Sequence, residues 1–132
     1  MKKIFNVLVI VSITLYAVWY FMPYAWVYLY DSQSLDLMGW TGFGAIIDIY
    51  GPIGYVLGLV YLISLFGLLF FKAWSRTLFT IMTVVNILIS PFTGVVIQGG
   101  YDVMIGSILG LANGAIIALM YLTSLSHEFR KV

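Results

Sequence analysis

The chain has 132 residues, of which 63% are hydrophobic and only 8% are charged, with a formal net charge of +1 and no cysteine. A soluble domain has about 45–50% apolar and about 25% charged residues, so this composition excludes a water-soluble fold. The lack of cysteine excludes disulfides and thiolate metal sites, and the small net charge gives no electrostatic basis for binding nucleic acid.

The first predicted element is a membrane-spanning helix over about residues 4–22. Its apolar run is longer than the core of a signal peptide, and no small-x-small cleavage motif follows, so we expect an uncleaved helix. Aromatic residues crowd its second half, as expected at the headgroup level of a bilayer. We expect the helix to continue past a kink at Pro23, although the two-residue period of the aromatic residues in 24–30 leaves an extended strand open.

The next segment, about residues 31–50, is a structured outer loop that is too apolar for an ordinary solvated loop. Trp40, Phe43 and Ile47 recur at helical spacing, which predicts a short helix lying at the outer membrane surface. Three glycines within 39–44 weaken that prediction, because glycine disfavours helices.

Three further spans are predicted over about residues 53–71, 77–96 and 103–124. Each is long enough to cross a hydrocarbon core of about 30 Å at about 1.5 Å per residue. Each must be helical, because lipid offers no hydrogen-bond partners to the backbone. The predicted fold is an all-α membrane protein, an antiparallel four-transmembrane-helix bundle that forms a single domain over residues 1–132.

The basic residues predict the orientation of this bundle. They occur before the first span, between the second and third, and after the fourth: Lys2, Lys3, Lys72, Arg76, Arg130 and Lys131. Because cytoplasmic loops collect Lys and Arg, both termini are predicted to be cytoplasmic, and the Met-Lys-Lys start fits a bacterial inner membrane. The tail from His127 onward is expected to be a solvated end near anionic headgroups.

Small residues on two spans indicate close helix packing. They are Gly54 and Gly58 on the second span, and Gly106, Gly110, Gly114 and Ala118 on the fourth. A four-residue spacing of small side chains lets two helix backbones approach closely. Packing within this chain is the favoured interpretation, and docking of another membrane protein or of a second copy is the alternative.

The third and fourth spans carry polar residues that need partners in lipid. They are Thr83, Asn86 and Ser90 on the third span and Asn113 on the fourth. We expect Asn86 and Asn113 to point into the bundle and to join helices by hydrogen bonds. The alternative is that the four residues line a polar pocket for a lipid headgroup, a quinone or a similar ligand.

Two carboxylates, Asp48 and Asp102, stand at the outer ends of the second and fourth spans, where a negative charge favours a helix N-terminus. No charged residue and no histidine lies at the centre of a span, which argues against an ion carrier. The residues show no grouping of nucleophile, base or metal ligands, so no catalytic residue, metal or cofactor is predicted.

The sequence therefore favours a non-enzymatic inner-membrane module that acts through helix contacts, as an accessory subunit or a partner-binding protein. Its predicted contact surfaces are the glycines of the fourth span and the outer segment 40–47. In size and topology it resembles several kinds of small bacterial inner-membrane protein, including the immunity proteins that protect against pore-forming toxins. The alternative is a carrier or binder of a lipid or a small apolar or amphipathic ligand between the third and fourth spans.

Overall fold

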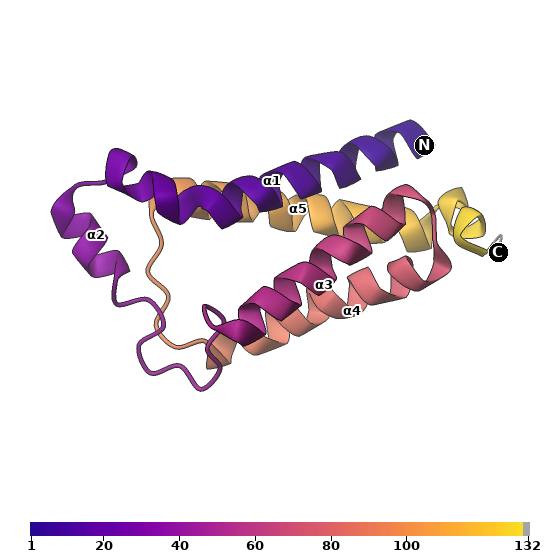
Figure 1. Ribbon diagram of the computed structural model, residues 1–132. Helices are drawn as coiled ribbons and strands as arrows, with labels where there is room; N and C mark the ends of the chain where they lie inside the picture. The colour runs from indigo at the N-terminus through magenta and orange to yellow at the C-terminus, as the bar shows by residue number, and fades with distance from the viewer. Residues whose placement is uncertain (131–132) are drawn as a thin grey trace.

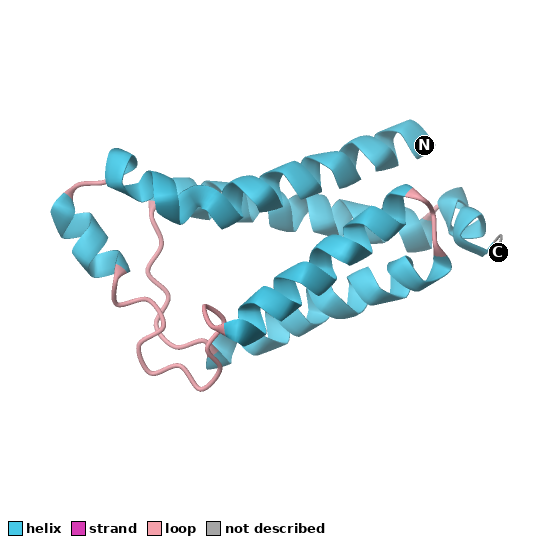
Figure 2. Ribbon diagram, viewed as in Figure 1, coloured by secondary structure: helices cyan, strands magenta, loops and turns pink. Residues whose placement is uncertain are grey.

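The computed structural model describes residues 1–130, and this part of the chain is mostly helical (Figure 2). Four helices are long and apolar enough to cross a membrane, which indicates a multi-pass membrane protein, the class that the composition predicts. They are α1 (Lys2–Leu29), α3 (Pro52–Leu69), α4 (Ala73–Ile89) together with the 3-10 turn that continues it to Phe92, and α5 (Gly100–Leu122).

The long helices form two pairs, in which α1 packs along α5 and α3 packs along α4 (Figure 1). The N-terminus, the C-terminal segment and the turn between α3 and α4 lie at one end of the molecule, here called the terminus end. The other two connections lie at the opposite end, here called the loop end. The two pairs lie close together at the terminus end and diverge toward the loop end.

A hydrophobic core joins the two pairs in the half of the molecule near the terminus end. All four long helices contribute to it, with Phe5 of α1, Leu68 of α3, Phe79 of α4 and Met120 of α5 completely buried. In lipid, such packing stabilises the fold mainly through van der Waals contact between closely fitted side chains. The divergence of the pairs at the loop end leaves that half without a comparable core.

The C-terminal tail folds onto this core instead of remaining solvated. Residues Ser124–Arg130 form a 3-10 helix, η2, in which Leu125 and Phe129 are buried. The ring of Phe129 packs edge-on against that of Phe5, with 5.8 Å between the centroids. The expectation of a solvated tail is wrong for Phe129, which completes the core, whereas His127 is exposed; Lys131 lies outside the described residues.

Helix α1 continues through Pro23 and ends at Leu29, so the prolonged-helix prediction is confirmed and the strand alternative for residues 24–30 is wrong. Its 28 residues correspond to a length of about 42 Å, which exceeds the roughly 30 Å of a bilayer core. The last turns of α1 therefore extend beyond the length needed to span a membrane.

The short helix of the first loop lies earlier in the chain than predicted. Helix α2 spans Ser32–Met38, and the Asp31 side chain caps it by accepting a backbone hydrogen bond of 3.1 Å. Residues 40–47 form turns and bends, and a helix there is a wrong prediction. The physical reason is that Gly42 and Gly44 adopt φ angles of 89° and 74°, which no right-handed helix permits.

Helix α4 begins at Ala73 and ends at Ile89, both earlier than the predicted third span, about residues 77–96. A single turn of 3-10 helix, η1 (Ser90–Phe92), follows it. Pro91 lacks the amide hydrogen that a continuing helix needs, so the chain leaves the helix there.

Candidate functional site

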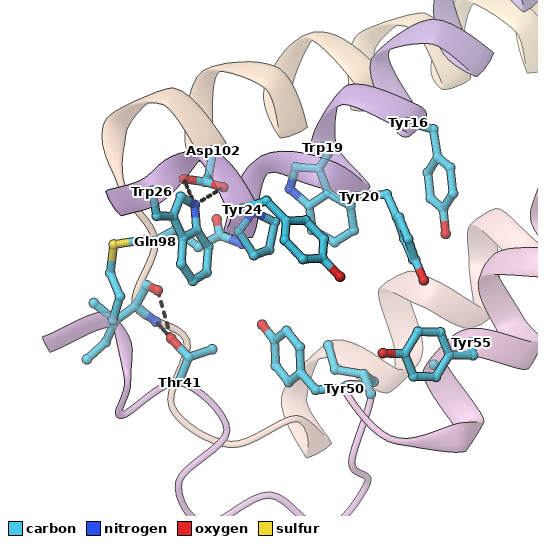
Figure 3. A pocket seen from close by; sticks show the side chains of 15 residues that line it. Tyr16, Trp19, Tyr20, Tyr24, Trp26, Thr41, Tyr50, Tyr55, Gln98 and Asp102 are labelled. Carbon is cyan, nitrogen blue, oxygen red and sulfur yellow. Dashed lines mark hydrogen bonds between the residues drawn. The ribbon is translucent and has the colours of Figure 1, made fainter. Parts of the chain in front are cut away.

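A cavity of about 400 Å³ lies at the loop end, and its walls come from α1, α3, the first turn of α5 and both loops (Figure 3). Small-molecule sites commonly measure about 300–1,000 Å³, so this volume suits a small ligand. The lining includes the carboxylate of Asp102. It is also rich in aromatic side chains, which are Tyr16, Trp19, Tyr20, Tyr24, Trp26, Tyr50 and Tyr55.

Helix α1 supplies one aromatic wall of the cavity. Tyr16, Tyr20 and Tyr24 are four residues apart and therefore share one face of the helix. Trp19, one turn before Pro23, lies beside them in the lining. In the sequence these rings are typical of an interfacial aromatic belt, and their four-residue spacing is the signal that indicates a shared wall.

The carboxylate of Asp102 ties α1 to the first turn of α5. It is almost completely buried, with 4% of its surface exposed. Both of its oxygens accept a hydrogen bond from the indole Nε1–H of Trp26 at 3.1 Å, and one also accepts from the Tyr30 hydroxyl at 3.3 Å. The predicted position at a helix start is correct, since Asp102 is in the first turn of α5, but the contacts to α1 were not predicted.

Asp48 shapes the turn that enters α3. Its Oδ1 accepts hydrogen bonds from the backbone amides of Tyr50 at 2.9 Å and Gly51 at 3.1 Å. The N-cap residue of α3 is Gly51, which has no side chain to cap it, so Asp48 fixes the preceding turn rather than the helix itself. This turn directs Tyr50 to the cavity.

Hydrogen bonds join the two loops beside the cavity, where Thr41 and Ile97 belong to its lining. The Gly42 amide donates to the Val95 carbonyl at 2.7 Å, and the Val95 amide donates to the Phe43 carbonyl at 3.0 Å. The hydroxyl of Thr41 donates to the Ile97 carbonyl at 2.7 Å. Segment 40–47, predicted to be a separate surface helix, is thus joined to the connection that leads into α5.

The predicted outer-surface side chains of this segment have different environments. Trp40 and Phe43 are exposed and pack edge to face, with 5.6 Å between ring centroids, whereas Ile47 is half-buried. They remain available as an apolar surface at the loop end.

The two sets of small residues have opposite environments. A Cβ atom added at Gly58 would collide with the Tyr16 hydroxyl, and one added at Gly54 would collide with a backbone carbonyl, so α3 uses both glycines for packing within the chain. For the glycines of α5 the sequence favours packing within this chain, and the structure contradicts that interpretation. A Cβ atom added at these positions would meet no neighbouring part of the chain within 4 Å: Gly106, Gly110 and Gly114. The neighbouring Ala118 is also exposed.

The predicted polar residues do not come together. Asn113 lies inside the molecule, and its Oδ1 accepts a hydrogen bond of 2.9 Å from the Tyr61 hydroxyl of α3. Asn86 is exposed and donates to the Met82 carbonyl of its own helix at 2.9 Å, so the expectation that it points inward is wrong. Polar side chains in helices often bond to the carbonyl four residues earlier. None of the predicted pocket residues lines the cavity: Thr83, Asn86, Ser90 and Asn113.

The negative charge of Asp102 influences the pKa of a phenol on another wall of the cavity. Burial raises the pKa of the Tyr50 phenol above its ordinary value of 10.0, and the negative charge of Asp102 raises it further. In the described part of the chain, no group of three or more His, Asp or Glu side chains could hold a metal ion.

Comparisons of this chain with protein-family models, with curated proteins and with solved structures give no match. The open face of α5 and the cavity at the loop end are therefore the observations on which a functional argument can stand.

Proposed function

We propose that this chain is a non-enzymatic membrane module that acts through helix contacts, as a subunit or partner-binding protein. Its docking surface is the face of α5 formed by Gly106, Gly110, Gly114 and Ala118, here called the glycine face. The observation that carries the proposal is the open space at all three glycines of this face. A helix of another membrane protein is the occupant that this face suits.

The glycines of α3 support this assignment by contrast. Gly54 and Gly58 allow other parts of the same chain to approach closely, so they have a use within the monomer. The glycine face has no such use among the described residues, although small residues at this spacing are typical of helix–helix interfaces in membranes.

A size series at Gly110 tests the proposal. Gly110→Ala and Gly110→Leu are expected not to lower the thermal unfolding temperature in detergent, because the added atoms enter open space and glycine is the poorer helix former. Co-purification of a membrane partner in mild detergent is expected to fall stepwise with side-chain size. Ile108→Ala, which changes bulk on a different exposed part of α5, is the matched control and is expected to retain the partner. A differently tagged second copy shows whether the partner is the chain itself. Full retention of every partner by a well-folded Gly110→Leu protein would refute this docking face.

We also propose that the terminus end is cytoplasmic, and that the protein belongs to a bacterial inner membrane. Lys2 and Lys3 lie near the N-terminus. Lys72 lies in the turn between α3 and α4 and Arg76 in the first turn of α4, and this turn is at the same end of the molecule (Figure 1). Cytoplasmic loops collect such residues, so the loop end faces outward and α2 lies near the outer membrane surface.

A second function is favoured by a separate observation, the aromatic cavity at the loop end. In this proposal the chain binds a small amphipathic ligand or a lipid there, rather than between the third and fourth spans. Concave sites with a mostly apolar lining and a few placed polar groups are the usual form of small-molecule sites.

A further inference from the structure

We infer that the cavity at the loop end binds an alkylated ammonium group attached to an apolar body. This inference rests on the second proposed function and names the chemical class of its ligand. The observations that carry it are the aromatic walls, the phenol oxygens that converge on one space, and the buried carboxylate beside them.

The walls suit a positive charge. The hydroxyl ends of Tyr20, Tyr24, Tyr50 and Tyr55 point toward the same space from α1 on one side and from α3 and its preceding loop on the other (Figure 3). Trp19 adds an indole to this lining. The phenol oxygens present partial negative charge to this space. Aromatic ring faces, where a ligand reaches them, also attract cations through their quadrupole, and tryptophan and tyrosine cages are a known means of holding quaternary ammonium groups.

The charges around the cavity select against an anion. Among the described residues, its lining contains the Asp102 carboxylate and no Lys, Arg or His side chain. The described hydrogen-bond donors to that carboxylate, the Trp26 indole and the Tyr30 hydroxyl, are both neutral, so among the described contacts the N-terminal dipole of α5 offsets part of its negative charge and no cationic side chain does. This charge already affects Tyr50 across the cavity, so a ligand in the same space also experiences it.

The chemistry of the ligand follows from what the walls offer. An alkylated ammonium spreads its charge over its methyl and methylene groups, which fit against rings and need few hydrogen-bond acceptors. The volume of about 400 Å³ accommodates such a group together with part of an apolar body. Tyr24 and Tyr55 remain 77% and 59% exposed, so the space is open to an incoming ligand.

The test uses the full-length protein in dodecyl maltoside, a non-ionic detergent, and follows its ¹⁵N-labelled indole signals. Benzyltrimethylammonium is the cationic probe, and neopentylbenzene, in which carbon replaces nitrogen, is its neutral isostere. The cation is expected to shift the signals of Trp19 and Trp26 in a saturable way. The signal of Trp74, which does not line the cavity, is expected to remain unchanged.

Two variants separate charge from shape. Asp102→Asn keeps an oxygen acceptor for Trp26 but removes the charge, and we expect it to weaken binding of the cation about tenfold. Asp36→Asn removes one charge from exposed α2 and is the matched control, with binding unchanged. If Asp102→Asn fails to fold, Tyr24→Leu removes an exposed ring of the wall and is expected to weaken binding of the cation severalfold.

Two soluble lipids distinguish a headgroup from a free cation. Dihexanoylphosphatidylcholine carries the ammonium group, whereas dihexanoylphosphatidylglycerol has the same acyl chains without it. Binding of the choline lipid but not of benzyltrimethylammonium would identify a lipid headgroup as the source. Equal binding of the two lipids, or of the cation and its neutral isostere, would overturn the ammonium inference while leaving a ligand cavity. A cavity that no probe enters would refute both the inference and the second proposed function.

Discussion

The indole Nε1–H of Trp26 donates to both carboxylate oxygens of Asp102, at 3.1 Å each, and so joins two residues that are 76 positions apart in the chain and belong to different helices. Trp26 belongs to the part of α1 that lies beyond Pro23, and Asp102 to the first turn of α5. The pair therefore fixes the loop end of the α1–α5 pair, where the hydrophobic core does not reach.

We predict that Trp26→Phe lowers the free energy of unfolding in detergent by about 1.5–3 kcal/mol, the usual contribution of a hydrogen bond to a charged group. Asp102→Asn should be less damaging in the Trp26→Phe background than in the wild-type chain, because the interaction is already lost. Thermal or denaturant unfolding of the single and double variants measures this coupling. Trp40→Phe, at an exposed indole, is the control, and purely additive losses would contradict the prediction.

A second prediction concerns the contact between Gly58 and Tyr16. Gly58→Ala places a Cβ atom against the Tyr16 hydroxyl and should cost about 1–3 kcal/mol by overpacking. In a Tyr16→Phe background the next atom, Cζ, is 3.6 Å away, which is an ordinary contact, so the loss should largely disappear. Gly106→Ala enters open space and should not lower the unfolding temperature. An equal loss with and without the Tyr16 hydroxyl would show that the contact is not the cause.

The two membrane asparagines should differ in their effect on stability. Tyr61→Phe deprives Asn113 of its partner on α3 and should cost about 0.6–1.7 kcal/mol, which runs from the average to the largest value measured for hydrogen bonds between membrane helices. Asn86→Leu should change stability by less than about 0.5 kcal/mol, since its side chain is exposed and bonds only within α4. Unfolding in detergent distinguishes them, and a larger loss for Asn86→Leu would reverse the assignment.

The proposed orientation predicts labelling from opposite sides of the membrane. Because the chain has no cysteine, Asp36→Cys and Ala73→Cys each introduce a single thiol. A membrane-impermeant maleimide applied to intact cells should label the first, on α2, and should reach the second, at the start of α4, only after the cells are opened. Labelling of Ala73→Cys in intact cells would place the terminus end outside.

The cap of α2 should respond to acid. Hydrogen bonds from Ser34 lower the pKa of Asp31 below its ordinary value of 3.8. A lowered pKa in the folded state means that the cap stabilises α2 above pH 3.8 and that this contribution is lost as the pH falls through the lowered value. Hydrogen-exchange protection of the Ser34 amide should therefore decrease in strong acid. Asp31→Asn, which cannot titrate, should abolish this pH dependence.

The long helices could be predicted because their signal is local. An apolar run of about 20 residues has few structural options in lipid, whatever the rest of the chain does. The continuation of α1 through Pro23 could also be predicted, since a membrane helix tolerates proline when neighbouring groups satisfy the backbone carbonyl that proline leaves without a hydrogen bond. The helix predicted for residues 40–47 does not form, although their apolar spacing is helical. The positive φ angles of Gly42 and Gly44 decide the conformation there.

The candidate site could not be predicted to the same extent, because it depends on which helices become neighbours. The spacing of Gly106, Gly110 and Gly114 shows that they share a face, but only the arrangement of α1 beside α5 shows that this face is open. In the same way, nothing local to Asp102 indicates that Trp26 lies opposite it. The sequence pattern of the aromatic residues in α1 is the same whether their rings contact lipid headgroups or line a cavity.

The pairing of the first long helix with the last has a consequence for biogenesis. Helix α1 is synthesised first, but its main neighbour, α5, is the final long helix to leave the ribosome. The α3–α4 hairpin, by contrast, can assemble as soon as its short turn has been made, because its two members are consecutive in the chain. Helix α1 must therefore wait in the bilayer without its native partner during most of translation, which leaves a period in which chaperones or other nascent helices can reach it.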